Sequence, residues 1–199
     1  YDSRFLIATQ KISYEQDRIN KKNKKKSEDL PGDSLLIYSI YAEKMWEIAD
    51  VSGYKIPKKW SGWMAYQLKS GIQDSSSADS SATEPTDKKA KAKTADKQSK
   101  GKPVILKKLS DGREHVFERV TEYVFAEESR MFFFLQEKGD SLQSSAAYAF
   151  DVSEEKIILL DSVHNHYKFI TPNRDGTALA FIASADSIGT KEPVYNLFL

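Results

Sequence analysis

The chain has 199 residues, 30 basic and 29 acidic, and its net charge of +1 provides no positive field that would attract a nucleic acid. It contains no cysteine, which excludes disulfides, thiolate metal sites and cysteine nucleophiles. No apolar run approaches the roughly 18 residues of a membrane span, and no signal peptide is visible. Because the chain starts at Tyr1, in a turn that leads into a strand, we expect a preceding address sequence to have been removed.

Short apolar runs bounded by polar turns follow one another along the chain, a pattern typical of strands. Asp111-Gly112 between two such runs is a strong hairpin signal, since both turn residues must tolerate positive φ. In chain order the expected strands are residues 5–8, 35–38, 45–48, 53–56, 63–66, 104–106, 115–117, 122–125, 131–134, 147–150, 157–160, 167–170, 178–181 and 194–197.

Two polar segments interrupt these strands. Residues 14–31 include five lysines between Lys21 and Lys26, but Glu28 and Asp29 follow and no aromatic residue lies among them to stack on bases. We therefore expect a solvated loop insert rather than a phosphate site. Residues 71–102 contain Ile72 as their only large apolar side chain. Such a segment cannot bury enough apolar area to offset the entropy of ordering, so a mobile insert is expected there.

The strands form a repeat. A polar turn before an apolar strand occurs four times, and Phe5, Met64, Phe132 and Leu179 mark the four strands. Phe132 lies 68 positions after Met64, 32 of them in the polar insert, and Leu179 lies 47 positions after Phe132. Each is followed by a second strand, most by a third after a tight turn, and another strand precedes the next polar turn. Propeller blades of four antiparallel strands have repeats of about 40 to 50 residues.

The repeat predicts an all-β fold, a partial β-propeller of about three and a half four-stranded antiparallel blades. A β-sandwich is the alternative, but it has no reason to repeat the same four-strand order. The expected organisation is propeller blades over 1–70 with a Lys-rich loop insert at 14–31, a low-complexity insert at 71–102, and further blades over 103–199. Closed propellers need roughly 4 to 8 blades. We therefore expect a segment of a longer protein, in which residues 131–135 would aggregate if left at an open edge.

The order of motifs carries a resemblance that covers most of the chain outside the low-complexity insert. The motifs are Asp33-Ser34-Leu35, Gly53-Tyr54-Lys55-Ile56-Pro57, Trp60-Ser61-Gly62-Trp63-Met64-Ala65-Tyr66, Leu109-Ser110-Asp111-Gly112, Tyr123-Val124-Phe125, Tyr148-Ala149-Phe150-Asp151 and Asp175-Gly176-Thr177-Ala178-Leu179-Ala180-Phe181. In this order the chain resembles the N-terminal β-propeller region of bacterial prolyl-oligopeptidase-family serine peptidases. Each motif alone is weak, because aspartate-glycine turns before apolar strands are common among propellers.

The resemblance implies a non-catalytic role. In that family the propeller restricts peptide substrate access to a C-terminal α/β-hydrolase domain of the same polypeptide, which carries a Gly-x-Ser-x-Gly nucleophile elbow. Residues 139–143 come nearest to such an elbow, and Gln143 breaks the pattern. We therefore expect this chain alone to be inactive, with no catalytic, cofactor or metal residue, in a periplasmic or secreted protein. The alternative is a propeller-type protein- or glycan-binding module with no hydrolase attached.

Three other patterns point to chemistry less strongly. Gly-Asp-Ser-Leu occurs twice, with Ser34 and Ser141, and together with Asp161 and His164 it has the residues of an ester hydrolase. The strand pattern lacks the helices of that fold, so an esterase is disfavoured. His164 and His166 could begin a zinc site, but a third ligand is not evident, and an inter-blade connection is favoured. The three tryptophans are expected to pack between blades rather than to line a ligand surface; they are Trp46, Trp60 and Trp63.

Overall fold

A computed structural model describes residues 4–24, 30, 32–69, 101–139, 144–187 and 190–199. Within these residues it contains twelve strands and one helix. The elements are β1 (Phe5–Gln10), α1 (Tyr14–Lys22), β2 (Asp33–Ser39), β3 (Lys44–Lys55), β4 (Trp63–Leu68), β5 (Lys102–Lys108), β6 (Glu114–Phe125), β7 (Met131–Gln136), β8 (Ala146–Asp151), β9 (Lys156–Asp161), β10 (His166–Pro172), β11 (Leu179–Ser184) and β12 (Asn196–Phe198).

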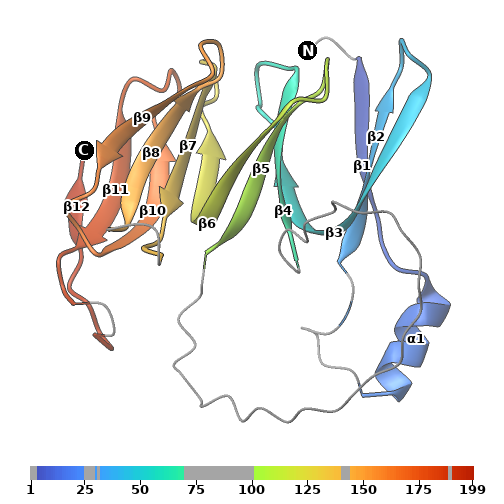
Figure 1. Cartoon of the computed structure of the whole chain (residues 1–199), viewed down its shortest axis with the longest axis horizontal. Helices are drawn as coiled ribbons and strands as arrows, with labels where there is room; N and C mark the ends of the chain where they lie inside the picture. Colours follow the sequence, from blue (N-terminus) through green and yellow to red (C-terminus); the bar gives the residue numbers. More distant parts are fainter. Residues whose placement is uncertain (1–3, 25–29, 31, 70–100, 140–143, 188–189) are drawn as a thin grey trace.

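All strand pairs are antiparallel and join neighbours in the sequence. One sheet has nine strands in the order β1 to β9, and a second has three strands in the order β10-β11-β12. Figure 1 shows the groups of strands following one another across the molecule, with β1, β2 and β3 at one end and β11 and β12 at the other. No strand crosses over another to pair, so the described part of the chain is a serial array of antiparallel ribbons.

Two long strands, β3 and β6, each belong to two successive groups of strands. Residues 44–48 of β3 pair with β2 and residues 51–55 pair with β4, and Val51 has a partner in each; a register shift accompanies each change of partner. In the same way, β6 pairs first with β5 and then with β7. A non-glycine residue with positive φ stands at each bend, Asp50 at 61° and Arg119 at 54°. The sequence predicted separate strands here, whereas each pair of expected strands is one bent strand.

The two bends divide the nine-stranded sheet into three units, and the three-stranded sheet is a fourth. Unit 1 is β1, β2 and residues 44–48, and unit 2 is residues 51–55, β4, β5 and residues 114–117. Unit 3 is residues 120–125, β7, β8 and β9, and unit 4 is β10, β11 and β12. Units 2 and 3 thus contain four strands each, in the order that the repeat predicted.

The same backbone contacts recur in successive units. Leu109 N–H donates to the Gly62 carbonyl at 2.8 Å, and Val152 N–H donates to the Arg130 carbonyl at 2.9 Å. Ile40 N–H makes the equivalent bond to the Arg4 carbonyl. The repeated geometry confirms an all-β fold built of propeller-type antiparallel units. How many blades the array forms stays a prediction.

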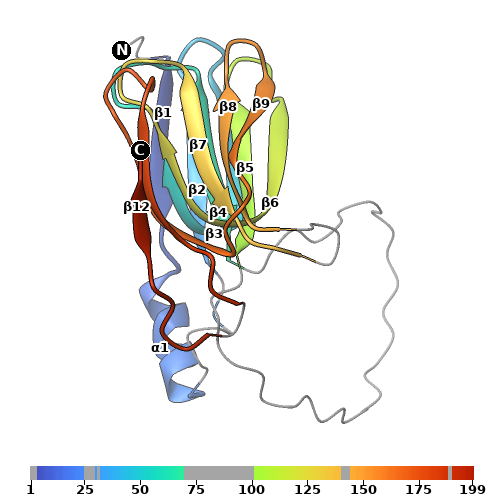
Figure 2. The ribbon, with the colours of Figure 1, turned by 90° about the vertical axis from the view of Figure 1, so that its left-hand side faces the viewer.

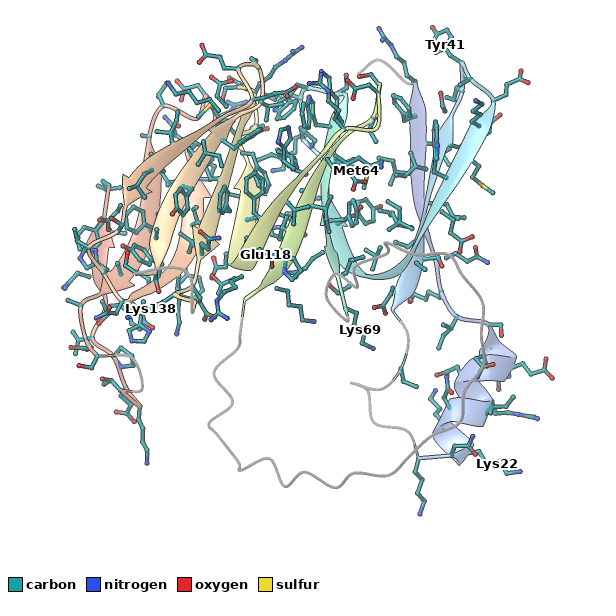
Figure 3. The ribbon with its side chains drawn as sticks, viewed as in Figure 1. Lys22, Tyr41, Met64, Lys69, Glu118 and Lys138 are labelled. Atoms are coloured by element: carbon teal, nitrogen blue, oxygen red, sulfur yellow. The ribbon has the colours of Figure 1, made fainter. Side chains whose placement is uncertain are left out.

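Apolar side chains are buried between the units. Alternate residues of β7 face opposite neighbours: Phe132 and Phe134 join the core cluster with unit 2, and Phe133 and Leu135 join the cluster with unit 4. A strand buried on both faces needs a continuous apolar run rather than an alternating one. The run at 131–135 is therefore central in the sheet, between β6 and β8, and is not an open edge. Between units 1 and 2, Met64 is buried among its neighbours, whereas Tyr41 stands clear at a hairpin tip (Figure 3).

The Lys-rich insert expected as a loop contains a helix, α1, which lies beyond the ends of the strands (Figures 1 and 2). The Ser13 side chain accepts a hydrogen bond from the Gln16 N–H and caps the helix. Acidic residues occupy the first turn and lysines the last, and Asp17 pairs with Lys21 at 2.7 Å. This charge order complements the helix dipole and stabilises the short helix, which ends at Lys22, within the lysine run.

The insert expected to be mobile falls outside the described residues, except for Gly101 and Lys102, which lead into and begin β5. Within the described residues, no helix is long and apolar enough to cross a membrane.

Candidate functional site between units 3 and 4

A pocket of about 600 Å³ lies between the last two units. Its walls are mainly apolar side chains from β7, β8 and β9 of unit 3 and from β11 and β12 of unit 4. These include Met131, Phe133, Ala149, Ile158, Leu160, Leu179, Phe181 and Phe198. Apolar pockets of roughly 300 to 1,000 Å³ with a few polar groups are typical of binding sites. This pocket is therefore the candidate site in the described part of the chain.

Asp161, at the end of β9, and His164, in the connection to β10, line the pocket, and Tyr167 of β10 is hydrogen-bonded to them. The Nδ1 atom of His164 lies 2.7 Å from the Asp161 carboxylate, and the Tyr167 hydroxyl donates to the same carboxylate oxygen at 3.1 Å. The backbone N–H of His164 donates to the Tyr167 hydroxyl, and the His164 ring centroid lies 4.5 Å from that of the Phe198 ring. The three side chains form one hydrogen-bonded group at the edge of the apolar cavity.

The hydrogen bonds set the charge of this group. Burial alone would raise the pKa of Asp161, but the hydrogen bonds from His164, from the Val163 N–H and from Tyr167 together lower it. Burial raises the pKa of Tyr167, and the neighbouring Asp161 carboxylate raises it further. At neutral pH the group therefore holds an anionic carboxylate and a neutral phenol, which orient the His164 ring.

The sequence pattern for an ester hydrolase is only partly assembled. Asp161 and His164 are in contact, as their spacing suggested. Ser34 lies in β2, paired with Gln10 of β1, and Figure 1 shows these strands at the opposite end of the array from β10. Ser141 lies outside the described residues. The described residues thus place no nucleophilic Gly-Asp-Ser-Leu serine beside His164.

The histidine pair has separate partners. His164 contacts Asp161, whereas the Nε2 atom of His166 lies 3.3 Å from the Ser187 carbonyl oxygen. Among the described residues, no group of three or more histidine, aspartate or glutamate side chains is placed to hold a metal ion.

Two of the three tryptophans pack between units, as expected. Trp63 is buried in the core cluster of units 2 and 3, and Trp60 packs against it and donates to the Ala126 carbonyl at 3.1 Å. Trp46 on β3 is 43% exposed, so the expectation of burial is wrong for it.

A charged cluster that sequence reasoning missed joins the turns of three units. Glu128, between β6 and β7, accepts from Lys59 at 2.7 Å and lies 3.3 Å from Arg174 in the turn before β11. The hydrogen bond from Lys59 and the charges of Lys59 and Arg174 hold the pKa of Glu128 below its usual range. Glu128 lies 69 positions after Lys59, and Arg174 lies 46 positions after Glu128. No local sequence pattern could therefore have indicated the cluster.

Replacing Asp161 by asparagine is expected to lower the unfolding free energy at pH 7 by about 1 to 2 kcal/mol, because its charged hydrogen bonds are lost. The folded-state pKa of Asp161 is lowered, so its stabilisation is present above the unfolded pKa of about 4 and is lost as pH falls through the folded value. Urea unfolding at pH 7 and at pH 3 measures this. The difference between the two proteins should shrink at pH 3; an undiminished difference would show that the carboxylate charge is not responsible.

The fold and the site define an all-β array of propeller-type units with an apolar pocket between two of them. No family model matches the chain, and no curated protein matches it. Solved structures do match, and two of them are proteases or parts of proteases.

The crystal structure of the tricorn protease is 15% identical with a TM-score of 0.46, over 83% of this chain and 15% of that one. The β-propeller domain of the Trilobed protease from Pyrococcus furiosus is 8% identical with a TM-score of 0.45, over 99% of this chain and 51% of that one. This chain thus spans about half or less of the length of either. Likenesses at these identities and TM-scores assign no activity to it.

Proposed function

We propose that this chain is the non-catalytic propeller segment of a serine peptidase of the prolyl-oligopeptidase family. In this proposal the units restrict and orient peptide access to an α/β-hydrolase domain that lies outside the chain. The observation that carries the proposal is the recurrence of a four-strand unit with the same backbone hydrogen bond beside two of its strands. The motifs of these units follow one another in the order that resembles this family. The peptide substrate, the hydrolase domain and a periplasmic or secreted location are parts of the same proposal.

The packing of the units supports a steric role. A gate must resist deformation, and the interface between units 2 and 3 is filled with packed aromatic rings, such as Phe117 and Phe134 at 4.4 Å and Phe117 and Phe150 at 5.5 Å. Close-packed interiors transmit strain rather than yield to it. Rigid units would thus define a fixed opening in front of a nucleophile on another domain.

The isolated 199-residue chain is expected to hydrolyse neither activated esters nor short peptide amides above the buffer rate. The reason is that the hydroxyl bonded to the Asp161–His164 pair is the Tyr167 phenol, whose raised pKa keeps it protonated and weakly nucleophilic, whereas Ser34 lies in β2 at the other end of the array. Release of p-nitrophenol from an acyl ester and of a fluorophore from a proline-containing peptide measures this. If the chain does hydrolyse esters and Ser34→Ala or Ser141→Ala abolishes this activity, the result would support an ester hydrolase instead.

Gating is tested on the whole polypeptide that contains this chain. We expect it to cleave short peptides but not folded proteins, and removal of the propeller to raise the relative rate on large substrates. Circular dichroism of the shortened enzyme is the control for loss of folding. If a folded, shortened enzyme keeps the same preference for short peptides, the propeller does not set it. A gene that continues without a Gly-x-Ser-x-Gly elbow would contradict the peptidase proposal outright.

One observation favours the alternative, a binding module without a hydrolase. The hairpin of unit 1 exposes Tyr41 by 82%, Met45 by 64% and Trp46 by 43%. Exposed aromatic side chains are common at recognition sites. A change in Trp46 fluorescence on adding a glycan or protein partner, absent in Trp46→Phe, would favour this function.

A further inference from the structure

The strand β9 carries an apolar run on the outer edge of its sheet. It pairs with β8 along one side, and the chain then continues into β10, which belongs to the other sheet. Among the described residues, no strand pairs with the outer side of β9. Its four consecutive aliphatic side chains, residues 157–160, are between 39% and 55% exposed. Such an edge presents unpaired backbone groups together with apolar side chains, and edges of this kind pair readily with another strand.

The exposure of Ile157 and Leu159 comes from their place on the outermost strand of unit 3. They pair with Phe150 and Tyr148 of β8, which belong to or pack against the core cluster between units 2 and 3. Ile157 and Leu159 therefore face the side on which unit 2 is present. They remain exposed there because β9 lies beyond the filled part of that interface.

The residues of β9 are complementary to themselves when two copies of the strand run antiparallel. Leu159 pairs with Tyr148 and Asp161 pairs with Ala147, so Leu160 is the extra residue of a bulge. Lys156, Ile158 and Asp161 consequently lie on one face of the strand. A two-fold axis at Ile158 then places Ile157 opposite Leu159 of the second copy and Lys156 opposite Asp161 of the second copy.

This register joins opposite charges at both ends of the strand pair. Lys156 is exposed, and the Asp161 carboxylate is anionic at neutral pH because its hydrogen bonds lower its pKa. The symmetry produces the Lys156–Asp161 pairing twice in one dimer. Cross-strand pairs of opposite charge stabilise a sheet, and aliphatic pairs between them are removed from water.

The outer strands of units 1 and 2 do not have this complementarity. Glu47 in unit 1 and Val116 in unit 2 stand where Leu159 stands in unit 3, each four positions along the preceding strand from the recurring backbone hydrogen bond. Self-pairing in unit 1 would bury the Glu47 carboxylate. Self-pairing in unit 2 about Val116 would place Glu114 opposite Glu118 of the second copy, and like charges in that position are unfavourable.

We propose that the outer edge of β9 is a dimerisation surface, and that its partner is the β9 edge of a second copy of this chain. The two strands pair antiparallel about a two-fold axis at Ile158 and join the two nine-stranded sheets into one continuous sheet. A two-fold contact of this kind uses the same surface on both copies and closes at two. The inference does not depend on the peptidase proposal.

The association is measured on the 199-residue chain by light scattering and sedimentation over a range of concentrations. We expect a reversible equilibrium between monomer and dimer. Leu159→Glu introduces at this place the residue that unit 1 has there, and it should raise the dissociation constant by roughly tenfold or more, since each dimer would bury two carboxylates. Val116→Glu is the matched control, at the equivalent and 47% exposed place of unit 2, and should leave the equilibrium unchanged. Circular dichroism and Tm show that both variants fold.

The register is tested with single cysteines, because the chain has none of its own. Ile158→Cys lies opposite itself in the dimer, and mild oxidation should link two copies through a disulfide. In Ile157→Cys the two cysteines are diagonal neighbours about 7 to 8 Å apart, which exceeds the reach of a disulfide, so little cross-linking is expected. Lys156→Glu places like charges opposite each other twice and should weaken the dimer, most strongly at low salt.

A chain that stays monomeric at every concentration would overturn the proposal. So would a mass that rises beyond two copies, because the contact would then not close, or a dimer that Leu159→Glu leaves intact, because it would then form elsewhere. Cross-linking of Ile157→Cys as fast as that of Ile158→Cys would contradict the two-fold axis at Ile158.

Discussion

Phe132→Ala is expected to lower the free energy of unfolding by about 3 to 5 kcal/mol, the largest loss at any single position of the core. Phe132 is fully buried at the centre of the cluster between units 2 and 3. Its ring lies within 6.0 Å of those of Phe117, Tyr123, Phe125 and Phe134. Removing the ring leaves a cavity that these neighbours, on β6 and β7, can fill only in part.

Urea unfolding followed by circular dichroism measures the loss, with the slope of the transition as a check that both proteins unfold alike. Phe169→Ala is the matched control, because Phe169 is 67% exposed and should change stability by less than about 1 kcal/mol. A small loss at Phe132, comparable with that control, would mean that the units do not pack through this cluster.

Gly101→Val is the second large effect, expected to destabilise the chain by about 2 to 3 kcal/mol. A Cβ atom at Gly101 would collide with the backbone carbonyl group of Arg119. Arg119 is the residue of positive φ at the bend of β6, and its carbonyl also accepts from the Glu137 N–H at 3.0 Å. The clash therefore falls on backbone that cannot move without breaking the bend.

Gly53→Ala is the control, since a Cβ atom at Gly53 would have no other atom within 4 Å. Its stability should be unchanged or slightly raised, because glycine in a strand carries extra unfolded-state entropy. Thermal unfolding of both variants decides the matter. Equal Tm values would contradict a close approach of the two segments at the bend.

The order of the strands could be predicted because the sequence signals for each strand lie within a few neighbouring residues. Apolar runs such as residues 131–134 indicate strands, and turns such as Asp111-Gly112 indicate the hairpins between them. The bends could not be predicted, because Asp50 and Arg119 adopt positive φ without the glycine that signals it. The bends are held by contacts distant in the sequence, among them those with Gly32 and Gly101, each 18 positions away, and the hydrogen bonds from the Lys69 and Glu137 N–H groups to the two bend carbonyls.

The candidate site shows the same limit. The spacing of Asp161 and His164 indicated a possible pair, and they do meet at 2.7 Å. Their third member, Tyr167, carried no sequence signal, and the pocket beside them exists only because unit 4 packs on unit 3. The helix α1 could not be predicted from hydrophobic periodicity, because its nine residues include few apolar side chains and therefore no apolar stripe.

β1 ends and β2 begins at the side of the array where α1 lies, and β4 ends and β5 begins at the same side (Figure 1). Both strand pairs are nevertheless in continuous register: Thr9 of β1 lies opposite Leu35 of β2, and Gln67 of β4 lies opposite Val104 of β5. The backbone hydrogen bonds between paired strands thus do not depend on the length of the connection that joins the strands. Insertions in either connection should therefore leave the strand pairing unchanged. A reporter domain inserted between β1 and β2 or between β4 and β5 should leave the sheet folded.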